Sequence, residues 1–294
     1  MMIAARKLVR DISDLPTIPT IVSKVVSMLD NQDSEPDEVA DLILSDQVLA
    51  ARVIRIVNSP LYRPSSEITS VKRALLYIGF RSVREMILTS CFIEGFREKE
   101  QPFDMKIFWT HSFTVGALSR HIAGQVGYGD SEKAYLVGII HDIGKVFLGH
   151  YRKNEYGQLL TSIKGTSYTT HEAEIEFFGT THCEVGLCLA QRWNFPPAYC
   201  DVVSYHHATE LATEDPLLTA IVNLADFFAI TRPNASSIAQ ASSNGKSEDN
   251  AWSILKQLSS RPLPGDLTAF LASLETSYEQ IQHEVGQLYS NMVA

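Results

Sequence analysis

Apolar residues recur at helical spacing through most of this 294-residue chain, and this period limits the fold more than any other feature. From Ile18 to Leu29 they follow the i, i+3, i+4, i+7 spacing of a single buried helix face. Similar short stripes continue to Gly95, with helix starts expected at Asp33 or Ser34, Ser45 or Asp46, Thr69 or Ser70, and Arg81. Gly79 is expected to end the fourth of these helices. No alternating stretch typical of a strand interrupts them, so the sequence predicts an all-α protein.

Changes in composition divide the chain into predicted parts. Polar residues around Pro102 set a boundary near residue 100, and the Ser-, Asn- and Ala-rich stretch from Thr231 to Ser247 is typical of a mobile loop. We therefore expect a two-lobed helical bundle with four segments: an N-terminal helical lobe at 1–100, a second helical lobe at 101–230, a flexible linker at 231–265, and a C-terminal amphipathic helix at 266–294.

Charge, apolar runs and cysteines exclude several classes of protein. The formal net charge is -9 at pH 7 and no basic stripe is present, so binding to a nucleic-acid backbone is not expected. No run of about 18 apolar residues occurs, so no membrane-spanning segment is expected. The 4 cysteines form no CxxC pair, which favours free thiols in a reducing compartment. We expect a cytoplasmic protein that does not bind membranes.

The predicted C-terminal helix carries an apolar seam. Its positions alternate spacings of four and three over three heptads: Leu267, Leu271, Leu274, Tyr278, Ile281, Val285 and Leu288. Such a seam packs either on the protein's own second lobe or against a second copy or a signalling partner. Three heptads are too few to decide between these alternatives.

Ionisable residues interrupt apolar helical stretches of the second lobe. His141 and Asp142 directly follow the apolar run 135–140, His111 lies in another apolar stretch, and Asp226 is the one acid in AIVNLADFFAI. Burying a carboxylate beside an imidazole costs several kcal/mol unless both are paired or bound to a cation. A divalent metal ion removes that cost, and it accepts neutral imidazole together with carboxylate. Any one of these histidines alone could be a hydrogen-bonded core residue, but the joint pattern predicts a metal site.

These residues carry a resemblance to a known superfamily. The order His111, His141-Asp142, Asp226 looks like the H…HD…D signature of the HD superfamily of metal-dependent phosphohydrolases, and HDIGK at 141–145 is similar to its best-known run. The stretch from Glu174 to Gly186, WNFP at 193–196 and the pair His206-His207 resemble the HDOD and HD-GYP branches.

The N-terminal lobe favours the HDOD branch. LPTIP at 15–19, SDQVLAARVIRIVNSPLY at 45–62 and ITSVKRALLYIGFRSVREM at 68–86 resemble the opening helices of that family, so the resemblance covers roughly residues 14 to 230. HDOD domains are generally regarded as non-catalytic signalling modules, and many have lost the HD ligands. This sequence keeps them, which leaves its activity open.

The resemblance implies a set of metal ligands. His111, His141, Asp142 and Asp226 match the mononuclear set, while His182, His206 and His207 match the further ligands of dinuclear HD-GYP enzymes. Two divalent ions such as Fe or Mn are therefore implied. The GYP element is absent after His207, and Ile107 stands where trinuclear sites have a glutamate, so neither a third metal nor cyclic di-GMP hydrolysis is expected.

The same resemblance implies roles for single residues. Asp142 would bridge the two metals as a catalytic residue, and Lys145, one turn from His141, would place its positive charge on a phosphate. Acids at 174 and 176 could orient ligand histidines. The remaining histidines are expected at the surface: His121, His150, His171 and His283.

Two functions stay open at this point. One is a metal-dependent phosphohydrolase acting on a nucleotide or another phosphoester. The other is a non-catalytic signalling module that binds a protein partner and carries structural or vestigial metals.

Overall fold

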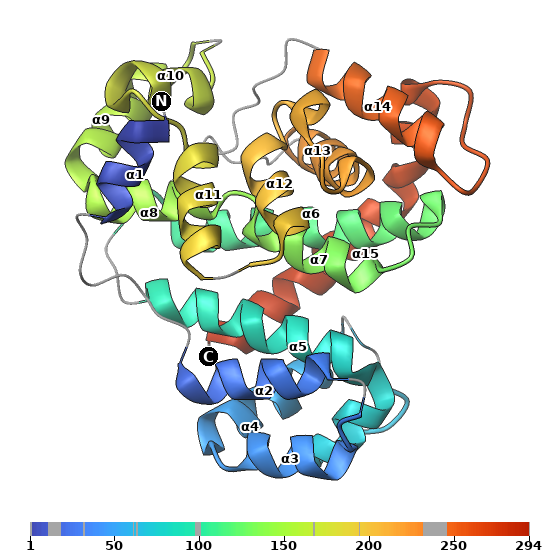
Figure 1. Cartoon of the computed structure of the whole chain (residues 1–294). Coiled ribbons are helices and arrows are strands. Elements are labelled where there is room, and N and C mark those ends of the chain that lie inside the picture. Colours follow the sequence, from blue (N-terminus) through green and yellow to red (C-terminus); the bar gives the residue numbers. More distant parts are fainter. Residues whose placement is uncertain are drawn as a thin grey trace. The chain divides into compact units, whose positions relative to one another are not determined.

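A computed structural model of the chain describes residues 2–10, 19–31, 33–60, 62, 64–97, 101–166, 168–193, 195–231 and 246–293. Within these residues the regular structure is entirely helical and contains no strand (Figure 1). The all-α prediction is thereby confirmed. None of the described helices combines the length and the apolar composition needed to cross a membrane.

The chain divides into two units. The larger unit combines Met1–Leu15 with Lys99–Glu279, and the smaller combines Pro16–Glu98 with Gln280–Ala294. The division differs from the predicted segments at both ends of the chain. The first helix, α1 (Met2–Arg10), clusters with the larger unit, and the border between Glu279 and Gln280 falls inside the last helix, α15 (Leu267–Val293).

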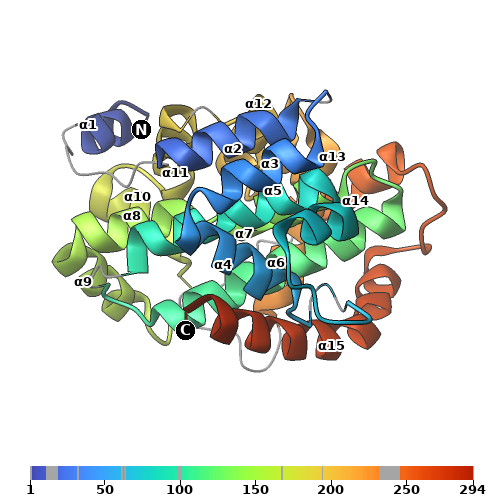
Figure 2. The ribbon, with the colours of Figure 1, turned by 90° about the horizontal axis from the view of Figure 1, so that it is seen from below.

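In the smaller unit three short helices pack on a long one. These are α2 (Thr20–Asp30), α3 (Pro36–Leu44) and α4 (Gln47–Val57), which contact α5 (Val71–Arg97) (Figure 2). Asp46 caps α4 as expected, because its carboxylate accepts a hydrogen bond from the Leu49 backbone N–H at 3.0 Å. The caps predicted for α3 at Asp33 or Ser34 are wrong: Glu35 is its N-cap residue and makes no side-chain capping bond.

Gly79 interrupts α5. Its backbone has φ 81° and ψ 164°, a conformation that only glycine adopts without strain. The two helices predicted on either side of Gly79 are therefore joined at a kink. Helical structure resumes directly after the glycine, instead of a loop.

The larger unit holds the helices of the predicted second lobe and one further helix, which lies in the predicted linker. In chain order these are α6 (Met105–Val126), α7 (Ser131–Ile140), α8 (Ile143–Tyr151), α9 (Lys153–Ile163), α10 (Thr170–Phe178), α11 (His182–Arg192), α12 (Pro197–Tyr205), the short helix η1 (Thr209–Leu211), α13 (Pro216–Ile230) and α14 (Lys246–Leu258). The helix α6 packs closely on α7 and also on α13, while α8 packs on α11. The core of this unit lies among these helices, with Phe113, Leu136 and Phe228 fully buried.

The linker prediction requires a correction. Residues 246–258, placed in the predicted linker 231–265, form α14, which packs on α13. Its inner face is buried through Ala251, Trp252 and Leu255. Residues 232–245 lie outside the described part of the chain.

The C-terminal helix predicted at 266–294 is α15. Four positions of its seam are buried within the chain: Leu274, Ile281, Val285 and Leu288. A side chain that already packs inside its own chain offers little surface to a partner. The seam therefore gives no support to the predicted dimer or partner contact.

Gly144 explains why α8 and α11 approach so closely. A Cβ atom at this position would lie 2.0 Å from the carbonyl oxygen of His182, which is backbone and cannot rotate away. Glycine thus lets the HDIGK helix lie directly against the start of α11.

We expect Gly144→Ala to lower the free energy of unfolding by about 1–3 kcal/mol, because the added methyl group forces the two helices apart. The measurement is urea denaturation followed by circular dichroism. Gly124→Ala in α6 is the matched control, since a Cβ there meets nothing within 4 Å among the described residues. This control should raise stability by about 0.5–1 kcal/mol. Equal stability of Gly144→Ala and the wild-type protein would refute the close approach.

Candidate metal centre

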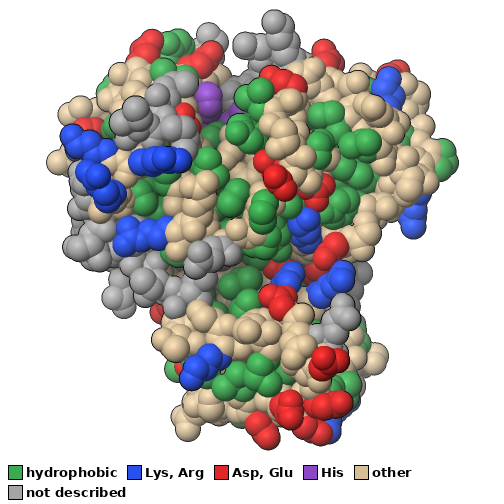
Figure 3. All heavy atoms as spheres, in the orientation of Figure 1, with side chains coloured by type: hydrophobic (Ala, Val, Ile, Leu, Met, Phe, Trp, Pro, Cys, Tyr) green, Lys and Arg blue, Asp and Glu red, His purple; other side chains and the backbone are tan. Residues whose placement is uncertain are grey.

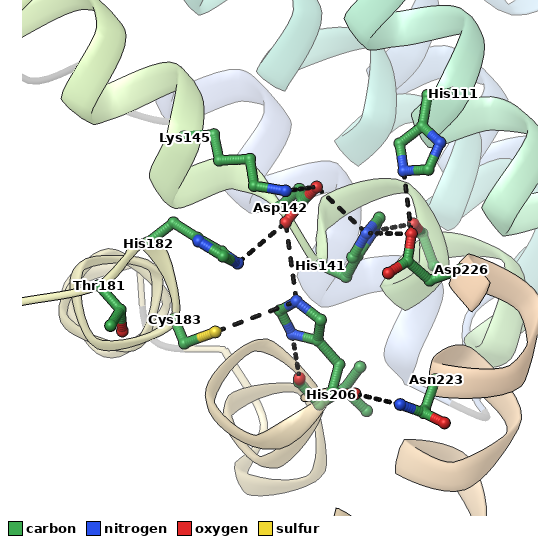
Figure 4. Close-up of polar contacts among 12 residues, drawn as sticks. His111, His141, Asp142, Lys145, Thr181, His182, Cys183, His206, Asn223 and Asp226 are labelled. Atoms are coloured by element: carbon green, nitrogen blue, oxygen red, sulfur yellow. Dashed lines mark hydrogen bonds and ion pairs between the residues drawn. The ribbon is translucent and has the colours of Figure 1, made fainter. Parts of the chain in front are cut away.

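The predicted ligands come from six helices of the larger unit or from the residues at their ends, and Figure 4 labels all of them except His207. His111 lies on α6 and Asp226 on α13, while His141 ends α7 and Asp142 begins α8. The other three are His182 at the first position of α11 and the pair His206 and His207 directly after α12. The start of α11 is fixed by Thr181, whose side chain caps the helix by accepting from the Glu184 N–H at 3.3 Å.

A first group of ligand atoms surrounds Asp226. Its Oδ1 lies 3.1 Å from His111 Nε2 and 3.6 Å from His141 Nε2. His141 Nε2 also lies 3.4 Å from Asp142 Oδ2. The structure therefore brings together residues that are 115 positions apart in the sequence (226 − 111).

A second group of candidate ligand atoms lies on the other side of the Asp142 carboxylate. The Oδ1 atom of Asp142 is 3.2 Å from His182 Nε2 and 3.6 Å from His206 Nε2. The ring of His207 is centred 4.1 Å from that of His206 and 5.3 Å from that of His182. Asp142 thus points one carboxylate oxygen toward each group of histidines (Figure 4).

The donor atoms fit a divalent cation. Among the described residues, His141 Nε2, His182 Nε2 and Asp142 Oδ1 are buried and make no hydrogen bond. Buried polar atoms are nearly always satisfied, so several unsatisfied ones aimed at each other indicate a missing partner. Ligand atoms of His111, His141 and Asp226 lie within 4.8 Å of one another, as do those of His141, Asp142 and His206. Imidazole nitrogen and carboxylate oxygen are ligands of Fe²⁺, Mn²⁺ and Zn²⁺.

Hydrogen bonds on the far side of three rings fix which nitrogen faces the centre. His141 Nδ1 lies 2.7 Å from the Gly138 carbonyl oxygen, and His206 Nδ1 lies 3.1 Å from that of Val202. A carbonyl only accepts, so each Nδ1 carries a hydrogen and each Nε2 faces the centre.

Glu174 orients the third ring. Its Oε2 lies 2.6 Å from His182 Nδ1 and accepts from the His182 backbone N–H at 2.7 Å, while Tyr156 donates to Oε1 at 3.0 Å. Burial raises the pKa of Glu174 to about 7, although these hydrogen bonds act in the opposite direction. The predicted role of Glu174 agrees with this geometry. That of Glu176 is wrong, because Glu176 is exposed and bonds to Tyr168.

Lys145 is buried and is therefore not an ordinary surface lysine. Its Nζ donates to Asp142 Oδ2 at 2.6 Å. Burial raises the pKa of the Asp142 carboxyl, but the charges of Lys145 and His141 outweigh this effect and hold it well below its ordinary value. Asp142 is therefore ionised, as a metal-binding carboxylate must be.

The histidines of the centre differ in the direction in which their surroundings shift the pKa. Burial lowers the pKa of His141, but Asp142 and Asp226 outweigh it and raise that pKa to about 10. Burial and the neighbouring Lys145 hold the pKa of His182 well below its ordinary value, and burial and His206 do the same for His207. His182 and His207 are thus neutral imidazoles ready to donate a lone pair, whereas at His141 a cation would replace a proton.

Two neighbours of the centre were not anticipated from the sequence. The ring of His171 lies 5.8 Å from that of His182 and 5.5 Å from that of His207, so the prediction that it lies at the surface is wrong. Its spacing of three residues from Glu174 is a signal that places both on one face of α10. Cys183 is the second neighbour, with its Sγ 4.0 Å from His206 Nε2.

The other unassigned histidines are further from the centre. His283 is exposed as expected, whereas His121 and His150 are half-buried, and His121 Nε2 lies 3.3 Å from Ser277 Oγ. Histidine side chains are also visible at one place on the surface of the face in Figure 3.

A helical fold with this buried cluster of histidines and carboxylates defines a protein with a candidate divalent-metal centre. The HDOD domain family matches residues 15–209 of the chain, and the chain belongs to that family. An HDOD domain protein of unknown function from Geobacter sulfurreducens has a similar structure, with 31% sequence identity, a TM-score of 0.80, and coverage of 98% of this chain and 97% of that one.

More distant relatives share the fold or part of the sequence. A candidate phosphohydrolase from Shewanella amazonensis has the same fold, with a TM-score of 0.70 at 23% identity, covering 96% of this chain and 97% of that one. Ribonuclease Y of Sulfurovum sp. is 28% identical over 125 residues, 42% of this chain and 19% of that protein. An uncharacterized protein of Treponema pallidum is 23% identical over 221 residues, 71% of this chain and 41% of that protein. This chain thus matches less than half the length of both sequence relatives.

Replacing Glu174 by glutamine should weaken divalent-metal binding by about 10–100-fold, because the amide no longer holds the His182 ring as a charged acceptor does. Metal affinity is measured by competition with a chromophoric chelator. Glu176→Gln, two positions along the same helix, is the matched control and should bind metal like the wild-type protein. The same loss of affinity in both variants would argue against an orienting role for Glu174.

Proposed function

We propose that the chain is a metal-dependent phosphohydrolase that acts on a nucleotide or another phosphoester. The observation that carries this proposal is the position of Asp142 between two groups of histidines. Its Oδ2 lies 3.4 Å from His141 Nε2, and its Oδ1 lies 3.2 Å from His182 Nε2. A carboxylate placed in this way suits a pair of divalent cations that share it, the arrangement of two-metal hydrolytic centres.

The seven predicted ligands divide between the two cations. One cation would be held by His111, His141, Asp142 and Asp226, and the other by Asp142, His182, His206 and His207. Fe²⁺ and Mn²⁺ are the ions we expect from the ligand types. When bound, such cations polarise a phosphoryl oxygen and lower the pKa of a coordinated water to about 7.

The chain's own residues prepare the centre for an anion. Lys145 is buried, and its ammonium group is fixed on Asp142 by a 2.6 Å hydrogen bond. A positive charge held in a site that excludes water interacts more strongly with a phosphate than a solvated lysine does. We therefore assign Lys145 as a donor to the phosphate oxygens and Glu174 as the residue that positions His182.

The substrate class is narrowed by the relatives. Ribonuclease Y acts, by its name, on RNA, which favours a phosphodiester bond as the first substrate to test. The formal net charge of -9 disfavours a long polyanion, because the repelled phosphates would need basic side chains to bind. A short phosphodiester such as a dinucleotide meets both conditions.

A non-catalytic signalling module is the second candidate. The observation that favours it is a set of large apolar side chains exposed on the smaller unit, where Leu44, Val48 and Leu76 have 54%, 66% and 65% of their surface accessible. Exposed apolar surface is typical of binding sites for other proteins. In this case bound metal raises the melting temperature of the protein by mass action, without any hydrolysis.

The decisive test is hydrolysis by the metal-loaded protein. Wild-type protein loaded with Mn²⁺ or Fe²⁺ should hydrolyse bis(p-nitrophenyl) phosphate or a dinucleotide, and His141→Ala should lose this activity by about 100-fold or more together with bound metal. Metal content is measured by elemental analysis of the same samples. His283→Ala is the control, because His283 is exposed on the last helix. Activity of the wild-type protein no higher than that of His141→Ala would support the second candidate.

A substitution at Lys145 tests the site without removing a ligand. Lys145→Met keeps the volume of the buried side chain, so about two metals per chain should remain bound. Its kcat should fall by about 10²-fold, because a charged donor to the phosphate is lost. Steady-state kinetics and elemental analysis measure the two quantities. A kcat unchanged from the wild-type value would remove Lys145 from the catalytic residues.

A further inference from the structure

A cysteine lies inside the second group of ligands, at a place where the family resemblance gives no ligand. Cys183 follows His182 in the first turn of α11, and its side chain is 3% exposed. Its Sγ lies 4.0 Å from His206 Nε2, and Figure 4 shows the sulfur pointing toward that ring. One ligand atom from each of His182, Cys183, His206 and His207 lies within 4.8 Å of all the others.

The neighbouring histidine nitrogens of this cluster point into the centre. His182 Nε2 is completely buried and makes no hydrogen bond among the described residues, while its Nδ1 is held by Glu174. His206 Nδ1 is held by the Val202 carbonyl, which leaves Nε2 on the side of the sulfur. His206 Nε2 therefore faces Cys183 Sγ at 4.0 Å, while the unbonded His182 Nε2 faces Asp142 Oδ1 at 3.2 Å in the same cluster.

The geometry is close to that of a mixed nitrogen and sulfur site. Bonds of about 2.0–2.1 Å to nitrogen and about 2.3 Å to sulfur place ligand atoms of a tetrahedral ion roughly 3.5 Å apart. The 4.0 Å separation between Cys183 Sγ and His206 Nε2 exceeds this value by about half an ångström. A side-chain adjustment of that size needs no movement of either helix.

We propose that Cys183 is a thiolate ligand of the second cation, in addition to Asp142, His182, His206 and His207. This inference rests on the metal centre proposed above. On binding, the S–H bond breaks, a sulfur–metal bond forms, and the proton passes to the solvent. The thiolate makes this position softer than the all-nitrogen and oxygen site around Asp226, so it selects Zn²⁺, Fe²⁺ or Co²⁺ over Mn²⁺ and Mg²⁺.

Cobalt substitution tests the sulfur bond directly. Protein stripped of metal and loaded with Co²⁺ should show a sulfur-to-cobalt charge-transfer absorption in the near ultraviolet in addition to the weak visible bands of Co²⁺. Cys183→Ser should lose the ultraviolet band and keep the visible bands. Cys188→Ser, five positions along the same helix, is the control and should keep both.

The outcomes separate this inference from the proposed function. Visible bands without the charge-transfer band in the wild-type protein, or a band that persists in Cys183→Ser, overturn the thiolate ligand and leave the metal centre intact. Failure to bind Co²⁺ at all overturns both. Should Cys183→Ser not fold, X-ray absorption at the zinc edge of the wild-type protein decides, because a sulfur neighbour at about 2.3 Å is required.

Discussion

The burial of carboxylates among imidazoles is the interaction on which the rest of the larger unit depends. Asp142, Asp226 and Glu174 are each no more than 6% exposed, and each needs a positive or hydrogen-bonding partner to remain there. Lys145 supplies one positive charge and a protonated His141 supplies another. Divalent cations would replace the proton and complete the compensation of negative charge. The buried carboxylates that lower the stability of the fold are therefore the same groups that could bind a cation.

Packing places these groups with little freedom. The contact of Gly144 with the His182 backbone brings Asp142 and His182 together at the junction of α8 and α11. Asn223 on α13 donates to the His206 carbonyl oxygen at 2.7 Å and so fastens the end of α12 to the helix that carries Asp226. Backbone contacts, together with hydrogen bonds on the far side of the His141, His182 and His206 rings, hold these side chains in place before any ligand arrives. A catalytic or a sensing function would require such a preorganised site.

Much of the fold could be predicted from local features of the sequence. Helical spacing predicted the all-α fold, and Asp46 was correctly expected to cap α4. The ionisable residues His141, Asp142 and Asp226 stood out because each follows or interrupts an apolar run, which is a local feature. The stretch containing α14 was misjudged, because it follows a Ser-, Asn- and Ala-rich segment and its few buried apolar residues, Ala251, Trp252 and Leu255, are too few to show a clear period.

The sequence by itself determined the helical fold class, which follows from residue spacing, and it showed His111, His141, Asp142 and Asp226 as ionisable residues in apolar helical stretches. The further candidate ligands His182, His206 and His207 came from the resemblance to the HD superfamily. Only the tertiary structure decided that Asp142 points an oxygen at each group, that Glu174 and not Glu176 holds His182, and that His171 and Cys183 lie beside the centre. These are relations between side chains on different helices. The direction of a side chain across a helix interface depends on the rotation and crossing of both helices, which the spacing along either one does not fix.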